Sequence, residues 1–187
     1  MTTLKLVSSQ LSSKKKTIAA RLLIADSEVK DVDILVTGLN LGVECWMIQK
    51  ESNVQEMLKK AICNIDLSIL HLLGHGMPGV ITLGNMKIDI ANWSILTCDN
   101  SEVSQTQSKR TLSCQRNRSI FKKWTICFWS CNTGEGSKGR AFIQHVANCT
   151  GAAVYASSGL VGHSKCGGSW QLNEVAYPQN FSNALKI

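Results

Sequence analysis

Two residues have surroundings that point directly to chemistry: His75, which lies between two glycines, and Cys131, which begins a glycine-rich stretch. A cysteine attacks as its thiolate, and a nearby imidazole can take the thiol proton or hold it as an ion pair. Each residue closely follows a short apolar run, so each is expected where a buried strand ends. We therefore interpret Cys131 as a nucleophile and His75 as its general base.

Gly76 adds a further element to this chemistry. Without a side chain, its backbone N–H can face a substrate carbonyl at close range. Together with the N–H of Cys131 it would form an oxyanion hole, in which each donor is typically worth ~3 kcal/mol. The stretch "CNTGEGSKG" after the strand keeps the surroundings of Cys131 open.

The elements that must position these residues follow from the apolar pattern. Continuous apolar runs predict strands over 22–25, 43–48, 67–73, 124–129 and 152–156, and "GGSWQLNEV" begins a sixth. Amphipathic spacing predicts helices over 32–39, 52–63 and 137–149, the second with Ser52 as N-cap and Gln55 in a capping box. Residues 80–88 form a hairpin through Gly84-Asn85.

Strands that are apolar throughout and alternate with helices predict an α/β protein, a three-layer sandwich around a mainly parallel sheet. In such folds ligands gather at the carboxyl ends of the strands. This edge is where the sequence places Asp26, His75, Cys131, Ser157 and Ser158.

Composition limits the classes of protein. The chain has 187 residues and a net charge of +7, and we predict one domain over 21–187, preceded by a basic extension over 1–20. The excess charge lies in residues 1–21 and 99–123, and the polar part of the second segment, over 99–119, is interpreted as a mobile basic loop. The remainder is slightly acidic, so nucleic-acid binding through these basic segments is only weakly indicated.

The chain reads as soluble and reduced. No apolar stretch approaches the ~18–20 residues needed to cross a membrane, and the N-terminus lacks the apolar region and cleavage site of a signal peptide. Several of the eight cysteines lie within strand or helix patterns, where cysteine acts as a small hydrophobic residue. We expect a cytoplasmic protein without disulfides.

A zinc site is an alternative use of the same residue types. Its donors would come from His71, His75, Cys127, Cys131, His163 and Cys166. Along an extended strand His71 and His75 would lie ~13 Å apart, and no compact Cys-x2-Cys pair is present. We therefore expect no metal or organic cofactor, and a structural role for His71 inside its strand and for His145 in its amphipathic helix.

Three stretches, "HLLGHGMPGVITLG", "WSCNTGEGSKGRAFIQHVANCTGAAVYAS" and "GGSWQL", resemble an uncharacterised bacterial domain family. That family often occurs at the N-termini of large adhesin-like surface proteins and belongs to the caspase, gingipain and clostripain clan of cysteine peptidases. The resemblance implies a caspase-like sheet, with His75 as general base, Cys131 as nucleophile, and the N–H groups of Gly76 and Cys131 as oxyanion hole. It also implies a peptide or protein substrate.

The resemblance further implies a substrate pocket that includes Asp26, Ser157 and Ser158. An acidic residue at the end of the first strand would favour cutting after Arg or Lys, because a carboxylate pairs bidentately with arginine. The loop over 99–119 contains Lys109, Arg110, Arg116 and Arg118, and such a peptidase would cut itself there. Two alternatives stay open: Asp26-Ser27 caps the next helix, or the domain is a catalytically silent interaction module.

Overall fold

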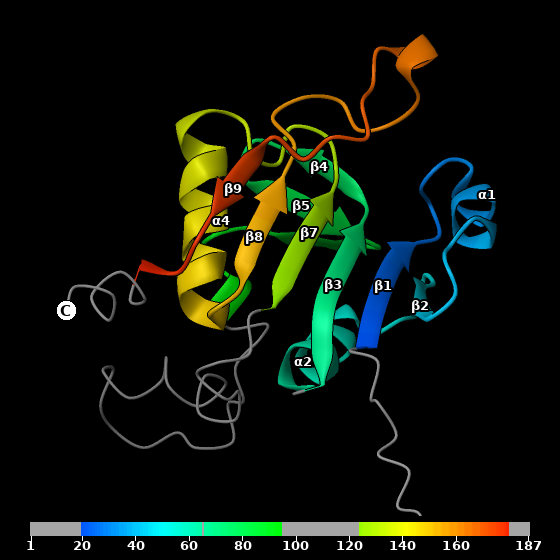
Figure 1. Ribbon diagram of the computed structural model, residues 1–187, viewed down its shortest axis with the longest axis horizontal. Helices are drawn as coiled ribbons and strands as arrows, with labels where there is room; N and C mark the ends of the chain where they lie inside the picture. Colours follow the sequence, from blue (N-terminus) through cyan, green and yellow to red (C-terminus); the bar gives the residue numbers. More distant parts are fainter. Residues whose placement is uncertain (1–19, 65, 95–123, 180–187) are drawn as a thin grey trace, which may run out of the picture.

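The computed structural model describes residues 20–64, 66–94 and 124–179 and is built around one six-stranded sheet. The strand order is β2-β1-β3-β7-β8-β9 (Figure 1). The strands are β1 (Ala20–Asp26), β2 (Val43–Ile48), β3 (Leu67–Leu73), β7 (Thr125–Trp129), β8 (Ala153–Ala156) and β9 (Glu174–Ala176). All neighbours pair in parallel except β9, which is antiparallel to β8. The predicted mainly parallel sheet is confirmed.

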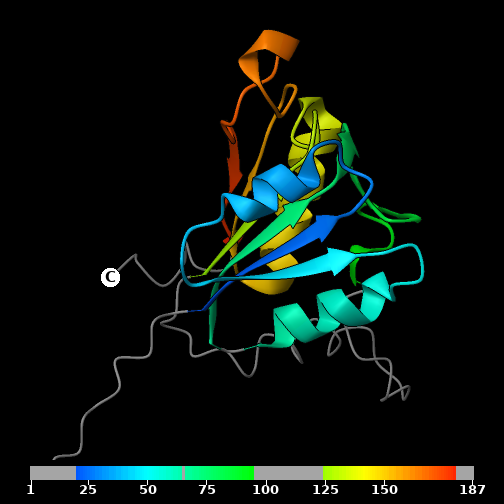
Figure 2. The same ribbon diagram turned by 90° about the vertical axis from the view of Figure 1, so that its right-hand side faces the viewer.

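Helices cover the two faces of this sheet, so the predicted α/β sandwich is also confirmed (Figure 2). The helices are α1 (Val32–Thr37), α2 (Val54–Cys63) and α4 (Gly136–Thr150). Side chains of α2 and α4, such as Leu58 and Phe142, share one large core with Leu70 and Leu72 of β3. On the opposite face α1 belongs to a smaller core that includes Leu73. Alternating side chains of the same strands therefore serve both cores.

A second, smaller sheet begins where β3 ends. It has the order β4-β5-β6 and consists of β4 (His75–Met77), β5 (Val80–Leu83) and β6 (Met86–Ile88), all antiparallel. The predicted hairpin over 80–88 is confirmed. The strand β4 was not expected from the sequence, because three residues that include a glycine carry too little periodicity to identify a strand.

Two local predictions need correction. The cap of α2 is Asn53, whose Oδ1 accepts the Glu56 N–H at 3.1 Å, whereas the Ser52 hydroxyl accepts the Gln49 N–H at 2.8 Å. Both residue types cap helices, and each bonds a different part of the turn here. The sixth strand is only Glu174–Ala176, because Ser169 makes an isolated bridge to Val161 instead of joining the sheet.

The predicted extension over 1–20, apart from Ala20, and the predicted loop over 99–119 lie outside the described residues. Within the described part of the chain no helix has the length and apolar character to cross a membrane. None of the cysteines in that part forms a disulfide.

Candidate functional site

The register of the central sheet brings His75 and Cys131 to the same level. The last parallel register pair between β3 and β7 is Leu73 with Trp129, and His75 and Cys131 each follow two residues later. The Gly74 N–H donates to the Trp129 carbonyl at 3.3 Å, so the segments that follow β3 and β7 remain side by side beyond that pair. Neighbouring strands are ~4.8 Å apart. His75 and Cys131 therefore lie at one edge of the sheet, as the order of the strands predicted.

The two glycines beside His75 are required by close approach. A Cβ on Gly74 would meet the Thr82 carbonyl oxygen and lie 2.8 Å from Leu83 Cδ2. A Cβ on Gly76 would meet the Cys131 carbonyl oxygen and the Thr133 hydroxyl. The first glycine lets the chain turn from β3 into β4, and the second lets β4 lie directly against the residue predicted to be the nucleophile.

Residues 130–135, here called the Cys131 turn, are fixed to the small sheet by buried hydroxyl groups. The Thr133 hydroxyl donates to the Val80 carbonyl of β5 at 3.2 Å. It also lies 2.6 Å from the Ser130 hydroxyl, which is therefore the donor of that bond. The Gly79 N–H donates to the Thr133 carbonyl at 3.1 Å. Ser130 and Thr133 are 1% and 0% exposed, so these bonds form away from water.

The loop after β8 fixes the Cys131 turn from the other side. The Asn132 N–H donates to the Gly159 carbonyl at 2.9 Å, and the Gly134 N–H donates to the Ser157 carbonyl at 2.9 Å. Asn132 has a φ of 58°, a left-handed conformation that asparagine tolerates better than most residues. The backbone around Cys131 is thus held by hydrogen bonds to two separate segments.

The predicted pocket residues Ser157 and Ser158 make bonds within this framework. The buried Ser157 hydroxyl donates to the Gly159 carbonyl and accepts the Gly159 N–H, both at 3.1 Å. Ser158 bonds Asn173 twice, through its N–H at 2.9 Å and its hydroxyl at 2.7 Å. These contacts connect the loop after β8 to the segment that precedes β9.

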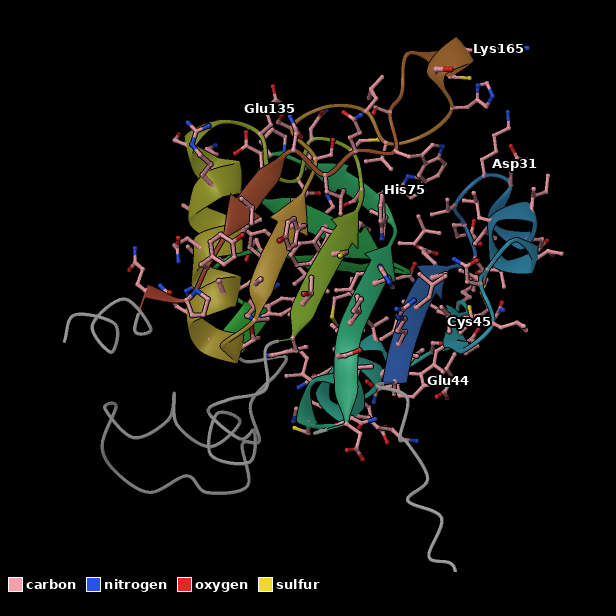
Figure 3. The ribbon with its side chains drawn as sticks, in the orientation of Figure 1. Asp31, Glu44, Cys45, His75, Glu135 and Lys165 are labelled. Carbon is pink, nitrogen blue, oxygen red and sulfur yellow. The ribbon has the colours of Figure 1, made fainter. Side chains whose placement is uncertain are left out.

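The side chains of His75 and Cys131 do not share a hydrogen bond in the described part of the structure. Instead, the Val161 N–H donates to the Cys131 Sγ at 3.4 Å, and the same sulfur lies 3.9 Å from the Val161 carbonyl oxygen. The His75 side chain is exposed (Figure 3). The sulfur therefore rests on the loop after β8, at the same edge as an imidazole that is open to solvent.

Asp26 lies at this edge but is closed to solvent. Its carboxylate is 1% exposed and accepts two backbone N–H groups, that of Glu28 at 3.0 Å and that of Gly84 at 2.8 Å. The second bond attaches the turn between β5 and β6 to the end of β1. The alternative that Asp26 caps the next helix is wrong, since α1 begins at Val32 with Asp31 as its N-cap. In this conformation Asp26 holds the small sheet in place.

His71 and Cys127, which lie within β3 and β7, have surroundings that suppress their charged forms. Burial lowers the pKa of His71, with a further contribution from Arg21, and its Nδ1 accepts the Trp129 indole N–H at 3.0 Å. Burial raises the pKa of Cys127 to about 11. The structural role expected for His71 fits these contacts. No group of three or more His, Cys, Asp or Glu side chains in the described ranges could hold a metal ion, so the residues of the alternative zinc site are not gathered there.

Two residues that contact the Cys131 turn, Thr133 and Val161, were not predicted from the sequence. A threonine two residues after the predicted nucleophile could have been recognised as a candidate, because a polar residue just beyond a buried strand needs a partner. The contribution of Val161 is a backbone N–H. Since every residue except proline has one, the residue type gives no signal.

Comparison with known proteins gives a family without an assigned activity. The family model described as Domain of unknown function (DUF4347) matches residues 22–184. No curated protein matches the chain.

Proposed function

The chain belongs to this family of domains of unknown function, and from the geometry of its sheet edge we propose that it is a cysteine peptidase of the caspase and gingipain type. One observation carries the proposal: the register brings His75, Gly76 and Cys131 together across two neighbouring strand ends. The resemblance of the surrounding motifs to that clan supports the same assignment.

The proposed reaction requires the Cys131 side chain to leave its contact with Val161. A peptide carbonyl bound at the edge would face the N–H groups of Gly76 and Cys131, and the sulfur would turn from Val161 toward it. The His75 imidazole takes the thiol proton as the sulfur attacks the carbonyl carbon, and the two N–H groups stabilise the oxyanion. Collapse breaks the peptide bond, and the leaving amine takes the proton from the imidazolium.

A water molecule completes the cycle. His75 removes a proton from the water, which attacks the thioester, and the acid product leaves while the proton returns to sulfur. The fixed backbone of the Cys131 turn supports this proposal, because an oxyanion hole must be positioned before charge develops.

The preference for Arg or Lys before the cut bond and self-cleavage within 99–119 are hypotheses separate from the main reaction. Asp26 would have to leave its bonds to Glu28 and Gly84 before it could meet a guanidinium group. The segment 99–119 lies outside the described residues. The assay that tests the main reaction also tests both of these hypotheses.

The competing proposal is a catalytically silent interaction module on the same fold. The position of the Cys131 sulfur on Val161, without a hydrogen bond to His75 in the described part of the structure, favours it. Catalytic hydrogen bonds are often long before substrate binds and tighten in the substrate complex, so a peptidase can also have this geometry in its free state.

The deciding experiment incubates the reduced, full-length chain with a peptide library and identifies the products by mass spectrometry. A peptidase should release fragments that disappear in Cys131→Ala and His75→Ala but persist in Cys63→Ala and His163→Ala, which replace exposed residues of the same types. The residue before each cut tests the preference for Arg or Lys, and the size of the purified chain over time tests self-cleavage. Absence of cleavage by the folded parent would favour the silent module.

A further inference from the structure

A second cysteine–histidine pair lies on α4. His145 and Cys149 are four residues apart, so they occupy one face of the helix. The Cys149 Sγ is 3.5 Å from the His145 Nε2. The Ser94 hydroxyl approaches both, at 3.0 Å from the His145 Nε2 and 3.5 Å from the Cys149 Sγ. These three side chains, here called the α4 cluster, form a closed triangle of one sulfur, one nitrogen and one oxygen.

The elements that carry the α4 cluster are firmly packed. Ser94 follows Trp93, a fully buried side chain whose ring packs edge-on against Phe128 and Phe142. The backbone N–H of Trp93 donates to the Asp89 carbonyl at 3.0 Å, and this bond fixes the turn before Ser94. Phe142 and Val146 bury the neighbouring face of α4 in the main core. The three polar atoms therefore meet because rigid elements bring them together.

The spacing of the α4 cluster matches one face of a tetrahedral zinc site. Zinc binds sulfur at ~2.3 Å, imidazole nitrogen at ~2.05 Å and carboxylate oxygen at ~2.1 Å, and the last length is taken for the Ser94 hydroxyl oxygen. Tetrahedral angles then put the donor atoms ~3.6 Å apart for S···N, ~3.4 Å for N···O and ~3.6 Å for S···O. The observed separations of 3.5, 3.0 and 3.5 Å are each within a few tenths of an ångström of these values.

We propose that Ser94, His145 and Cys149 bind one zinc-class divalent cation, with the Cys149 thiol losing its proton to solvent as the sulfur–metal bond forms. A thiolate and an imidazole select such metals over magnesium or calcium. Among the residues that the structure describes, no fourth side chain contacts the three donor atoms, and a water molecule would complete the tetrahedron.

The cation would join the turn before Ser94 to the last turns of α4, and it would stabilise the folded chain by binding the native state alone. The cluster is remote from the predicted catalytic residues. The helix α4 begins directly after the Cys131 turn (Figure 1). Cys149 lies 13 residues beyond its first residue, Gly136, which is about 20 Å along the helix axis. Metal binding and peptidase activity can thus be tested separately.

The test is a titration of the reduced, metal-free full chain with Co²⁺. We expect one Co²⁺ per chain to produce sulfur-to-cobalt charge-transfer absorption, and Zn²⁺ to displace it because zinc binds such sites more tightly than cobalt. Cys149→Ser should abolish the absorption. His145→Gln should weaken Co²⁺ binding by at least about tenfold, since even loss of an outer-shell partner of a ligand costs ~10–100-fold.

Two controls separate this site from other thiols. Cys131→Ser should bind Co²⁺ like the parent, and so should the double variant of His163→Gln and Cys166→Ser, which removes another closely spaced histidine and cysteine. Signal that survives Cys149→Ser, or absence of signal in the folded parent at about a tenfold excess of Co²⁺, would overturn the proposal.

A measurement on the parent chain covers the case in which Cys149→Ser fails to fold. Zn²⁺ should slow iodoacetamide alkylation of Cys149 at least about tenfold, as read by peptide mass spectrometry, because coordinated sulfur is a poorer nucleophile. Cys166 should be alkylated at the same rate with and without Zn²⁺. Equal alkylation of Cys149 under both conditions would contradict the site.

Discussion

The molecule contains two cysteine–histidine pairs that are built in opposite ways. His75 and Cys131 come from two strand ends far apart in the sequence and share an edge but no hydrogen bond in the described structure. His145 and Cys149 lie one helical turn apart and are in direct contact. At the sheet edge, backbone hydrogen bonds fix the segment around Cys131. On α4, the contacts are made by the side chains of Ser94, His145 and Cys149.

This difference indicates which chemistry each pair favours. In the proposed reaction, attack on a carbonyl needs fixed N–H donors and access for the substrate. The backbone of the Cys131 turn is fixed by hydrogen bonds, and the His75 side chain is exposed. Metal binding needs donor atoms at set distances, and α4 provides these. Under the two proposals, direct contact between a thiol and an imidazole does not by itself identify a catalytic pair, and the arrangement of the surrounding backbone distinguishes the two sites.

The largest expected effect comes from replacing the two cysteines in turn. Cys131→Ala should lower kcat/KM for peptide cleavage by more than about a thousandfold, because the nucleophile is lost, whereas Cys149→Ala should leave it within about twofold. The measurement is initial rates on the best library peptide, with circular dichroism to confirm the fold. If the Cys149 variant were the inactive one, the roles assigned to the two pairs would be reversed.

Closing the space at the edge should have the next largest effect. Gly76→Ala places a methyl group against the Cys131 carbonyl and the Thr133 hydroxyl. We expect a loss of about 1–3 kcal/mol in the free energy of unfolding from overpacking, and a fall of about 10²–10³ in kcat as the oxyanion hole is distorted. Gly159→Ala is the matched control, because a Cβ there meets nothing within 4 Å.

Urea unfolding and steady-state kinetics on the same samples measure both effects of Gly76→Ala. Normal activity in this variant would show that the N–H of Gly76 has no part in the reaction.

The sequence was sufficient to predict the edge pair because its position follows from topology. Apolar runs located β3 and β7, and the rule that parallel strands end at one edge placed His75 and Cys131 together. The sequence was insufficient for contacts that depend on exact packing. The bond from the Gly84 N–H to Asp26 joins distant residues through a backbone donor, and no pattern of residue types identifies it.

The α4 cluster also shows that contacts between elements cannot be predicted from the sequence pattern. The spacing of His145 and Cys149 was visible in the sequence, but amphipathic helices commonly carry such pairs without a function. Only the position of Ser94, fixed by the burial of Trp93, distinguishes this pair. Helix periodicity predicts which residues share a face, whereas the partner from another element depends on tertiary packing.

A third prediction uses Cys127 as the reference for an unreactive thiol. Burial raises the pKa of Cys127 from 9.0 to about 11, so its thiolate fraction near pH 8 is about 100-fold below that of an unperturbed thiol. Iodoacetamide should alkylate Cys127 at least about 100-fold more slowly than the exposed Cys166. The rate should rise about tenfold per pH unit up to about pH 11, since deprotonation precedes attack.

Peptide mass spectrometry of timed samples compares the alkylation rates of Cys131 and Cys149 with those of Cys127 and Cys166. In urea Cys127 should react as fast as Cys166, which controls for access of the reagent. Equal rates for Cys127 and Cys166 in the folded chain would mean that burial does not protect Cys127.

The prediction with the smallest expected effect tests whether Asp26 helps to hold His75 and Cys131 in position. In Asp26→Asn, one of the two backbone N–H groups now bonded to the carboxylate faces an amide NH₂ and loses its acceptor. At a side chain that is 1% exposed, we expect a loss of about 1–3 kcal/mol in the free energy of unfolding. Asp66→Asn, on an exposed residue, should change it by less than about 0.5 kcal/mol.

Because the Gly84 bond supports β5, which pairs with β4 at His75, the Asp26 variant should slow cleavage after basic and apolar residues by the same factor. Urea unfolding and the ratio of kcat/KM for matched arginine and leucine peptides measure the two effects. An unchanged stability together with a selective loss of cleavage after arginine would instead make Asp26 the specificity pocket.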